Sequence, residues 1–71
     1  MLETAFQQVV DSIGVDLIEF GQPGYYYAIH VPEDFEYVLG CVENMRDAEW
    51  IQTLLSQHYG IYVEFTDVEM W

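Results

Sequence analysis

Three side chains of this sequence could act as a nucleophile and two could act as its base. Ser12, Ser56 and Cys41 carry a hydroxyl or a thiol, and His30 and His58 carry imidazoles that exchange a proton near neutral pH. No nucleophile signature surrounds any of them, and Cys41 lies in an apolar stretch typical of a buried small side chain. His30 and His58 fall where structural roles are favoured, on a strand and at a helix end. We therefore expect no catalytic residue and no enzyme.

Metal and cofactor sites are not indicated either. Residues 32–36 lack the alternating Asp or Asn and the central Gly of a calcium loop. A single cysteine, Cys41, does not form a zinc site of the usual kind, and no Gly-rich segment resembles a phosphate-binding loop. Carboxylate pairs of the glycosidase type need a concave cleft, for which a 71-residue domain has little room. The sequence predicts no metal and no cofactor.

The charge balance is the unusual feature. Thirteen Asp and Glu residues stand against one basic residue, Arg46, and the formal net charge is −12. Solubility needs a net charge of only about 2–8 in magnitude for a small domain, and a larger charge destabilises the compact state by self-repulsion. We interpret the absence of lysine as a sign of binding to a cationic surface. Adaptation to a saline environment and an incidental acidic surface are the alternatives.

The same composition bears on location. One cysteine forms no internal disulfide, which fits a reducing compartment, and Met1–Glu3 begins no secretory signal. The apolar runs are too short to span a membrane. We expect a cytoplasmic protein without membrane contact, located in the host cytoplasm if a phage encodes it.

Apolar spacing predicts two helices and three strands. Helices are expected over residues 2–13 and 47–59, because apolar residues recur there at helical spacing and a glycine follows each segment. Strands are expected over 15–20 and 25–31, joined as a hairpin by a Gly-Gln-Pro-Gly turn. The alternating segment 61–66 is the third strand, and the tail through Trp71 is expected to extend it.

Residues 32–45 are compatible with two structures. Pro32 followed by two acidic residues suits a helix start, and the apolar spacing is closer to 3.6 than to 2. Many strand-forming residues and Gly40 favour a strand instead. With the helix preferred, residues 1–71 form a single acidic α+β domain of order α-β-β-α-α-β. Its small antiparallel sheet has three or four strands, and the helices pack on one face.

The candidate binding residues are carboxylates with tyrosines nearby. If residues 32–45 are helical, Glu33, Glu36 and Glu43 share one stripe. Glu36 and Glu43 are then about 10 Å apart, close to three phosphate rises of about 3.4 Å along one DNA strand. Further candidates continue the acidic tract or could anchor an interface as exposed aromatic rings: Asp47, Glu49, Glu64, Asp67, Glu69, Tyr26 and Tyr62.

Small size, high negative charge and absent lysine together resemble the acidic inhibitors of phages and mobile elements, such as anti-CRISPR and anti-restriction DNA mimics. The resemblance covers this profile and no alignable segment. It implies a stoichiometric inhibitor that binds the basic groove of a nucleic-acid-binding protein or nuclease complex and does not contact nucleic acid itself. The alternative is a small acidic adaptor or complex subunit that binds through an aromatic sheet face, to itself as a homodimer or to a larger complex.

Overall fold

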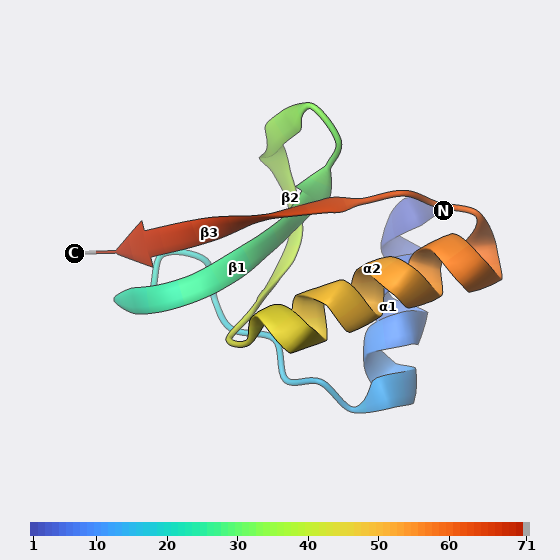
Figure 1. Cartoon of the computed structure of the whole chain (residues 1–71), viewed down its shortest axis with the longest axis horizontal. Helices are drawn as coiled ribbons and strands as arrows, with labels where there is room; N and C mark the ends of the chain where they lie inside the picture. The colour runs from blue at the N-terminus through green and yellow to red at the C-terminus, as the bar shows by residue number, and fades with distance from the viewer. Residues whose placement is uncertain (71) are drawn as a thin grey trace.

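Two helices and three strands make up the computed structural model, which describes residues 1–70 apart from the side chain of Met70; Trp71, placed by the sequence in the last strand, lies outside the described residues. The elements follow in the order α1 (Leu2–Ile13), β1 (Gly24–Val31), β2 (Asp34–Val42), α2 (Met45–Tyr59) and β3 (Glu64–Met70) (Figure 1). The expected α+β class, with helices packed on one face of a small antiparallel sheet, is confirmed.

Both helices end as their sequences predict. α1 covers the predicted range, and Gly14 follows it in the left-handed conformation (φ 71°), with its N–H donating to the Val10 carbonyl at 3.0 Å. α2 begins two residues earlier than predicted, so Asn44 takes the N-cap position and Asp47 lies in the first turn. Neither helix in residues 1–70 has the length and apolar character that crossing a bilayer requires.

The helix preferred for residues 32–45 is wrong. Residues 34–42 form β2, which pairs antiparallel with β1. This hairpin pairing satisfies the backbone of a segment rich in strand-forming residues, whereas a helix would place Gly40 in its interior. Gly40 has a specific role in β2, because a Cβ built on it would lie 2.9 Å from Cζ of Phe6 on α1. The glycine therefore allows α1 to approach the sheet closely.

The strand expected over residues 15–20 is also wrong. That segment forms a single antiparallel bridge, in which the Ile18 N–H donates to the Cys41 carbonyl at 2.9 Å. The predicted hairpin therefore does not form. β1 instead pairs with β2 through a tight connection in which Glu33 takes a positive φ of 65°. The local turn signal at residues 21–24 was misleading because the real partner strand of β1 follows it in the sequence.

The sheet order β2-β1-β3 places β1 in the centre, and its side chains alternate between two apolar layers. Tyr27 and Ile29 face the helices, and Tyr26 and Ala28 face away from them. The larger core, on the helix side, contains Ala5, Phe6, Val9, Val10, Ile29, Val42, Ala48, Ile51, Leu55 and Val63. The smaller core, on the second face, contains Tyr26, Ala28 and Cys41 and is covered by Ile18, Val38 and Val68.

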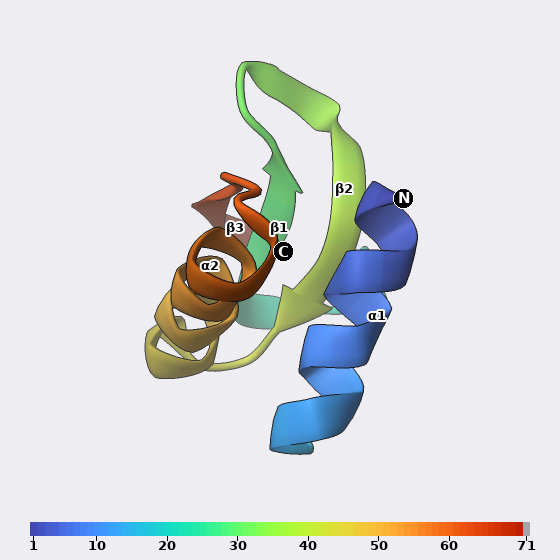
Figure 2. The same cartoon turned by 90° about the vertical axis from the view of Figure 1, so that its right-hand side faces the viewer.

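The helices do not cover the whole sheet. In Figure 1 the free ends of β1 and β3 extend beyond α1 and α2, and in both views the β1–β2 hairpin projects away from the helices (Figures 1 and 2). The projecting parts carry exposed aromatic rings, including Tyr25 and Phe35. The parts of the sheet that lack a helix therefore present exposed aromatic side chains to a partner.

Candidate binding surface

The first predicted acidic residues do not share a helical stripe. Glu33 lies in the connection between β1 and β2, Glu36 lies within β2, and Glu43 directly follows β2. At about 3.3 Å per residue, extended chain separates Glu36 and Glu43 by roughly 23 Å, more than twice the helical spacing of about 10 Å. The predicted match to three phosphate rises is therefore wrong. All three side chains are exposed, so they remain available to a partner.

Asp47 and Glu49 lie near the start of α2. Asp47 is half-buried in the first turn, and Glu49 is exposed. A carboxylate in the first turn interacts favourably with the positive end of the helix dipole. The negative charge of Asp47 is thus explained by stabilisation of α2. Glu49 is the more accessible of the two carboxylates to a partner.

The acidic residues of β3 are divided between the two faces of the sheet. Asp67 lies opposite Tyr27 and Glu69 lies opposite Tyr25, whereas Glu64 lies opposite His30 and points to the other face. β3 is an edge strand, and charged side chains on an edge discourage pairing with another chain. These three carboxylates therefore do not form one continuous patch.

The two predicted aromatic anchors differ in exposure. Tyr26 is only 1% exposed, so its predicted role as an exposed anchor is wrong. Its strand is central, and Ile18 packs over the face on which its ring lies, with Phe20 packed edge-on at 6.4 Å between ring centroids. Tyr62 is 59% exposed, beside the polar residues Gln52 and Gln57 of α2. Tyr62 remains a candidate contact.

An apolar groove was missed by the sequence analysis. It encloses about 580 Å³ between residues 18–20 and β2, and its lining includes Ile18, Phe20, Phe35, Glu36, Val38 and Cys41. Phe20 and Phe35 are 61% and 68% exposed. Single exposed rings are common on protein surfaces, but these two line one groove together, and contiguous apolar surface of this kind is typical of interaction sites. The groove was not predictable while residues 15–20 were placed in the sheet and residues 32–45 in a helix.

His30 is held by both of its ring nitrogens. Nδ1 lies 3.0 Å from the Val31 carbonyl and must donate to it, and Nε2 lies 2.7 Å from the Thr66 hydroxyl. The imidazole is 1% exposed and packs against the Phe35 ring at 4.8 Å between centroids. His30 therefore ties the β1–β2 hairpin to β3, and its contacts support the structural role inferred from the sequence.

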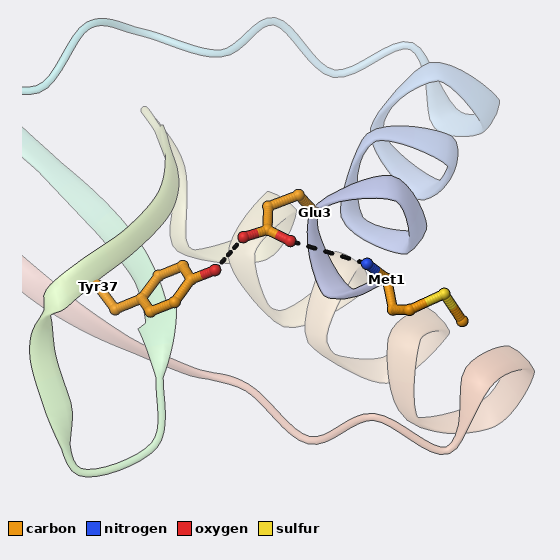
Figure 3. A network of polar contacts seen from close by, with 3 residues as sticks. All are labelled: Met1, Glu3 and Tyr37. Atoms are coloured by element: carbon orange, nitrogen blue, oxygen red, sulfur yellow. Dashed lines mark hydrogen bonds and ion pairs between the residues drawn. The ribbon is translucent and has the colours of Figure 1, made fainter.

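A polar contact joins the start of α1 to β2. The Tyr37 hydroxyl donates to Glu3, and the Met1 ammonium group lies 3.9 Å from Oε1 of the same carboxylate (Figure 3). The hydrogen bond from Tyr37 lowers the pKa of Glu3 and, in return, raises the pKa of Tyr37. The bond therefore favours a charged Glu3 beside a neutral Tyr37.

Most of the negative charge has no cationic partner. Across residues 1–70, the Met1–Glu3 contact is the one ion pair, and Arg46 is exposed without one. The unpaired carboxylates are thus suited to contacts with cationic groups.

Neither a reactive thiol nor a metal site is found among the described residues. Burial raises the pKa of the Cys41 thiol, which therefore stays protonated at neutral pH. No group of three or more His, Cys, Asp or Glu residues within the described chain is arranged to hold a metal ion.

Comparison with known proteins gave no match: no family model fits the chain, and neither a curated protein nor a solved structure is significantly similar to it.

Proposed function

We propose that this protein is a stoichiometric inhibitor that occupies the basic, nucleic-acid-binding surface of another protein. The supporting observation is the unpaired charge. Thirteen acidic residues stand against one arginine, and every one of them except Asp47 and Glu64 is exposed. A compact protein with so much like charge gives up stability through self-repulsion. Binding to a Lys- and Arg-rich surface offsets this cost and gives the charge a function.

The charge also has a suitable density along the molecule. The longest dimension is 36 Å, and the net charge is −12. One strand of DNA carries a phosphate about every 3.4 Å, so the same length of one strand carries roughly eleven charges. The net charge therefore matches one strand better than a full duplex. A groove that grips one strand is the best electrostatic fit.

Occupancy alone produces inhibition in this proposal, and no catalytic group is needed. The spread of carboxylates over several elements raises the rate of encounter with a basic surface, and this steering weakens as salt is added. Exposed aromatic rings would then slow dissociation. Inhibition should be complete at one inhibitor per binding site.

Competition tests the proposal. The immobilised protein is used to isolate partners from a host lysate, and each is then titrated with labelled nucleic acid in the presence and absence of the inhibitor. We expect the two ligands to exclude one another, with the apparent affinity for nucleic acid falling in proportion to free inhibitor. A stable ternary complex would refute occupancy of the nucleic-acid site.

Charge reversal provides a second test. Glu36→Lys with Glu43→Lys should slow association with the partner and flatten its salt dependence, because both carboxylates are exposed, one within β2 and one directly after it. The matched control, Asp11→Lys with Asp16→Lys, changes the net charge equally on exposed positions of α1 and the following loop. A larger effect of the first pair locates the contact near β2. Unchanged association for both pairs would contradict the proposal.

The apolar groove supports a second candidate, an adaptor that binds through its aromatic surface. Such an adaptor would bind its partner largely independently of salt and would leave the nucleic-acid site accessible. The ternary complex that refutes the first proposal is the result that this alternative predicts.

A further inference from the structure

We propose that the groove between residues 18–20 and β2, hereafter the Phe20–Phe35 groove, binds an extended segment of the partner protein in which apolar and basic side chains alternate. This inference rests on the proposed function, since it names the part of the basic partner that the inhibitor holds. In this arrangement the carboxylates attract the basic partner, and the groove fixes the position of the bound segment along the inhibitor.

The interior of the groove is suited to apolar side chains. Its volume of about 580 Å³ lies within the range of roughly 300–1,000 Å³ typical of ligand sites. Phe20 and Phe35 contribute rings, and Ile18 and Val38 contribute aliphatic groups. Each ring is fixed from one side, Phe20 by Tyr26 and Phe35 by His30, and is exposed on the other. Each ring therefore has one face packed against the protein and the other available to a partner.

The rim of the groove is acidic. Glu36 belongs to the lining, and Asp34 and Glu36 together line an adjoining surface depression. The Asp34 carboxylate accepts a hydrogen bond from the backbone N–H of Glu36 at 3.2 Å. Both carboxylates are exposed. Lysine or arginine residues flanking an apolar residue would meet this rim while the apolar residue enters the groove.

A second copy of the chain is a poor occupant for the same reason. Each copy has a net charge of −12, so self-association would bring like charges together along the acidic rim. Nucleic acid is repelled by the same charge. A basic protein segment is complementary to both the rim and the interior.

The adjacent strand edge favours an extended conformation for this segment. β2 is an edge strand: one side pairs with β1, and on the other side a single bridge joins Cys41 to Ile18. The register with β1 is irregular between Val31 and Ile29, where β2 has extra residues, and this part of β2 carries Phe35 and Glu36. An extended segment presents alternate side chains to one side, which matches an apolar groove with a charged rim.

Two synthetic peptides of equal length and charge test the inference. The first is an octapeptide of alternating Lys and Leu, and the second is its matched control of alternating Lys and Ser. We expect the Lys-Leu peptide to bind at least roughly tenfold more tightly, because only its apolar side chains fill the groove. Its NMR shift changes should concentrate at Ile18, Phe20, Phe35 and Val38. Equal affinity for both peptides, or shift changes centred on Tyr62, would overturn the assignment.

Matched variants of the protein complete the test. Phe20→Ala and Phe35→Ala should each lower the affinity for the Lys-Leu peptide by roughly tenfold. Tyr62→Ala removes a ring of similar exposure elsewhere and should lower that affinity by less than about twofold. Glu36→Lys keeps the apolar walls and should weaken both peptides. Circular dichroism checks the fold of each variant, and the Glu36 result stands even if an alanine variant unfolds. Equal losses of peptide affinity in Tyr62→Ala and Phe20→Ala would contradict the groove as the binding site.

The peptide result is separable from the competition result. If the Lys-Leu peptide binds the groove but partner, nucleic acid and inhibitor form a ternary complex, then the proposed function fails and the groove assignment holds. If the peptide fails while inhibitor and nucleic acid still compete, then the groove assignment fails and inhibition depends on the carboxylates alone.

Discussion

The hydroxyl oxygen of Tyr26 accepts a hydrogen bond of 2.7 Å from the backbone N–H of Gly21. This bond joins the central strand to the connection after residues 15–20, on the face opposite the helices. It explains why a tyrosine, and not a phenylalanine, is buried at this position. It also holds Phe20, one wall of the groove, against the sheet.

Replacing Tyr26 by Phe should therefore loosen this connection. We expect a loss of about 1 kcal/mol in the free energy of unfolding, because the Gly21 N–H loses its partner while the ring stays packed. Hydrogen exchange at the Gly21 amide should accelerate. The control is Tyr25→Phe on the same strand, where the side chain is 72% exposed and little change is expected. Equal exchange at Gly21 in both variants would contradict the role given to this bond.

Gly40→Ala should destabilise the packing of α1 on the sheet. A Cβ at this position would lie 2.9 Å from Cζ of Phe6 and 3.3 Å from Cδ2 of Leu17. Overpacking of this kind costs about 1–3 kcal/mol, measurable by chemical denaturation. Adding Phe6→Leu should recover part of the loss, because the shorter side chain vacates the space. Additive losses in the double variant would show that the contact is not the cause.

The Glu3–Tyr37 contact should contribute to stability in a defined pH range. The hydrogen bond lowers the pKa of Glu3 from its ordinary value of 4.5 and raises that of Tyr37 from 10.0. The contribution of Glu3 is therefore present above pH 4.5 and is lost as pH falls through its lowered pKa. The contribution of Tyr37 is present below pH 10.0 and is lost as pH rises through its raised pKa.

Tyr37→Phe checks this range directly. The variant should be slightly less stable than the parent chain at pH 7, because the exposed contact is screened by water, and this difference should be smaller at pH 3, where protonation of Glu3 is favoured. The measurement is the unfolding midpoint in denaturant at both values. A difference that persists unchanged at pH 3 would point to lost packing of the ring instead.

Added salt should raise the melting temperature of the free protein. The Debye length falls from about 30 Å at 0.01 M to about 8 Å at 0.15 M, which is shorter than the 36 Å long axis across which the carboxylates repel one another. Glu36→Gln with Glu43→Gln should reduce the size of this increase. A melting temperature that is independent of salt would contradict the view that self-repulsion costs stability.

The sequence alone determined the parts of this protein that depend on local patterns. The apolar spacing of residues 2–13 and the glycine after each helix were sufficient to predict α1 and the end of α2, because a helix satisfies its own backbone. The excess of carboxylates is likewise a property of composition and does not depend on the fold. These features support an acidic α+β protein with a candidate role in binding.

Tertiary structure alone decided the features that require contact between separate segments of the chain. Residues 34–42 have both helical and strand patterns, and pairing with β1 settles the matter because strand hydrogen bonds come from another segment. The same pairing moves Glu36 and Glu43 off a common stripe. Tyr26 is buried because Ile18 and Phe20 pack over it on the second face of the sheet, and Phe20 and Phe35 line one groove although 15 positions separate them in sequence. No local periodicity encodes this groove, since it depends on the bridge that places residues 18–20 beside β2.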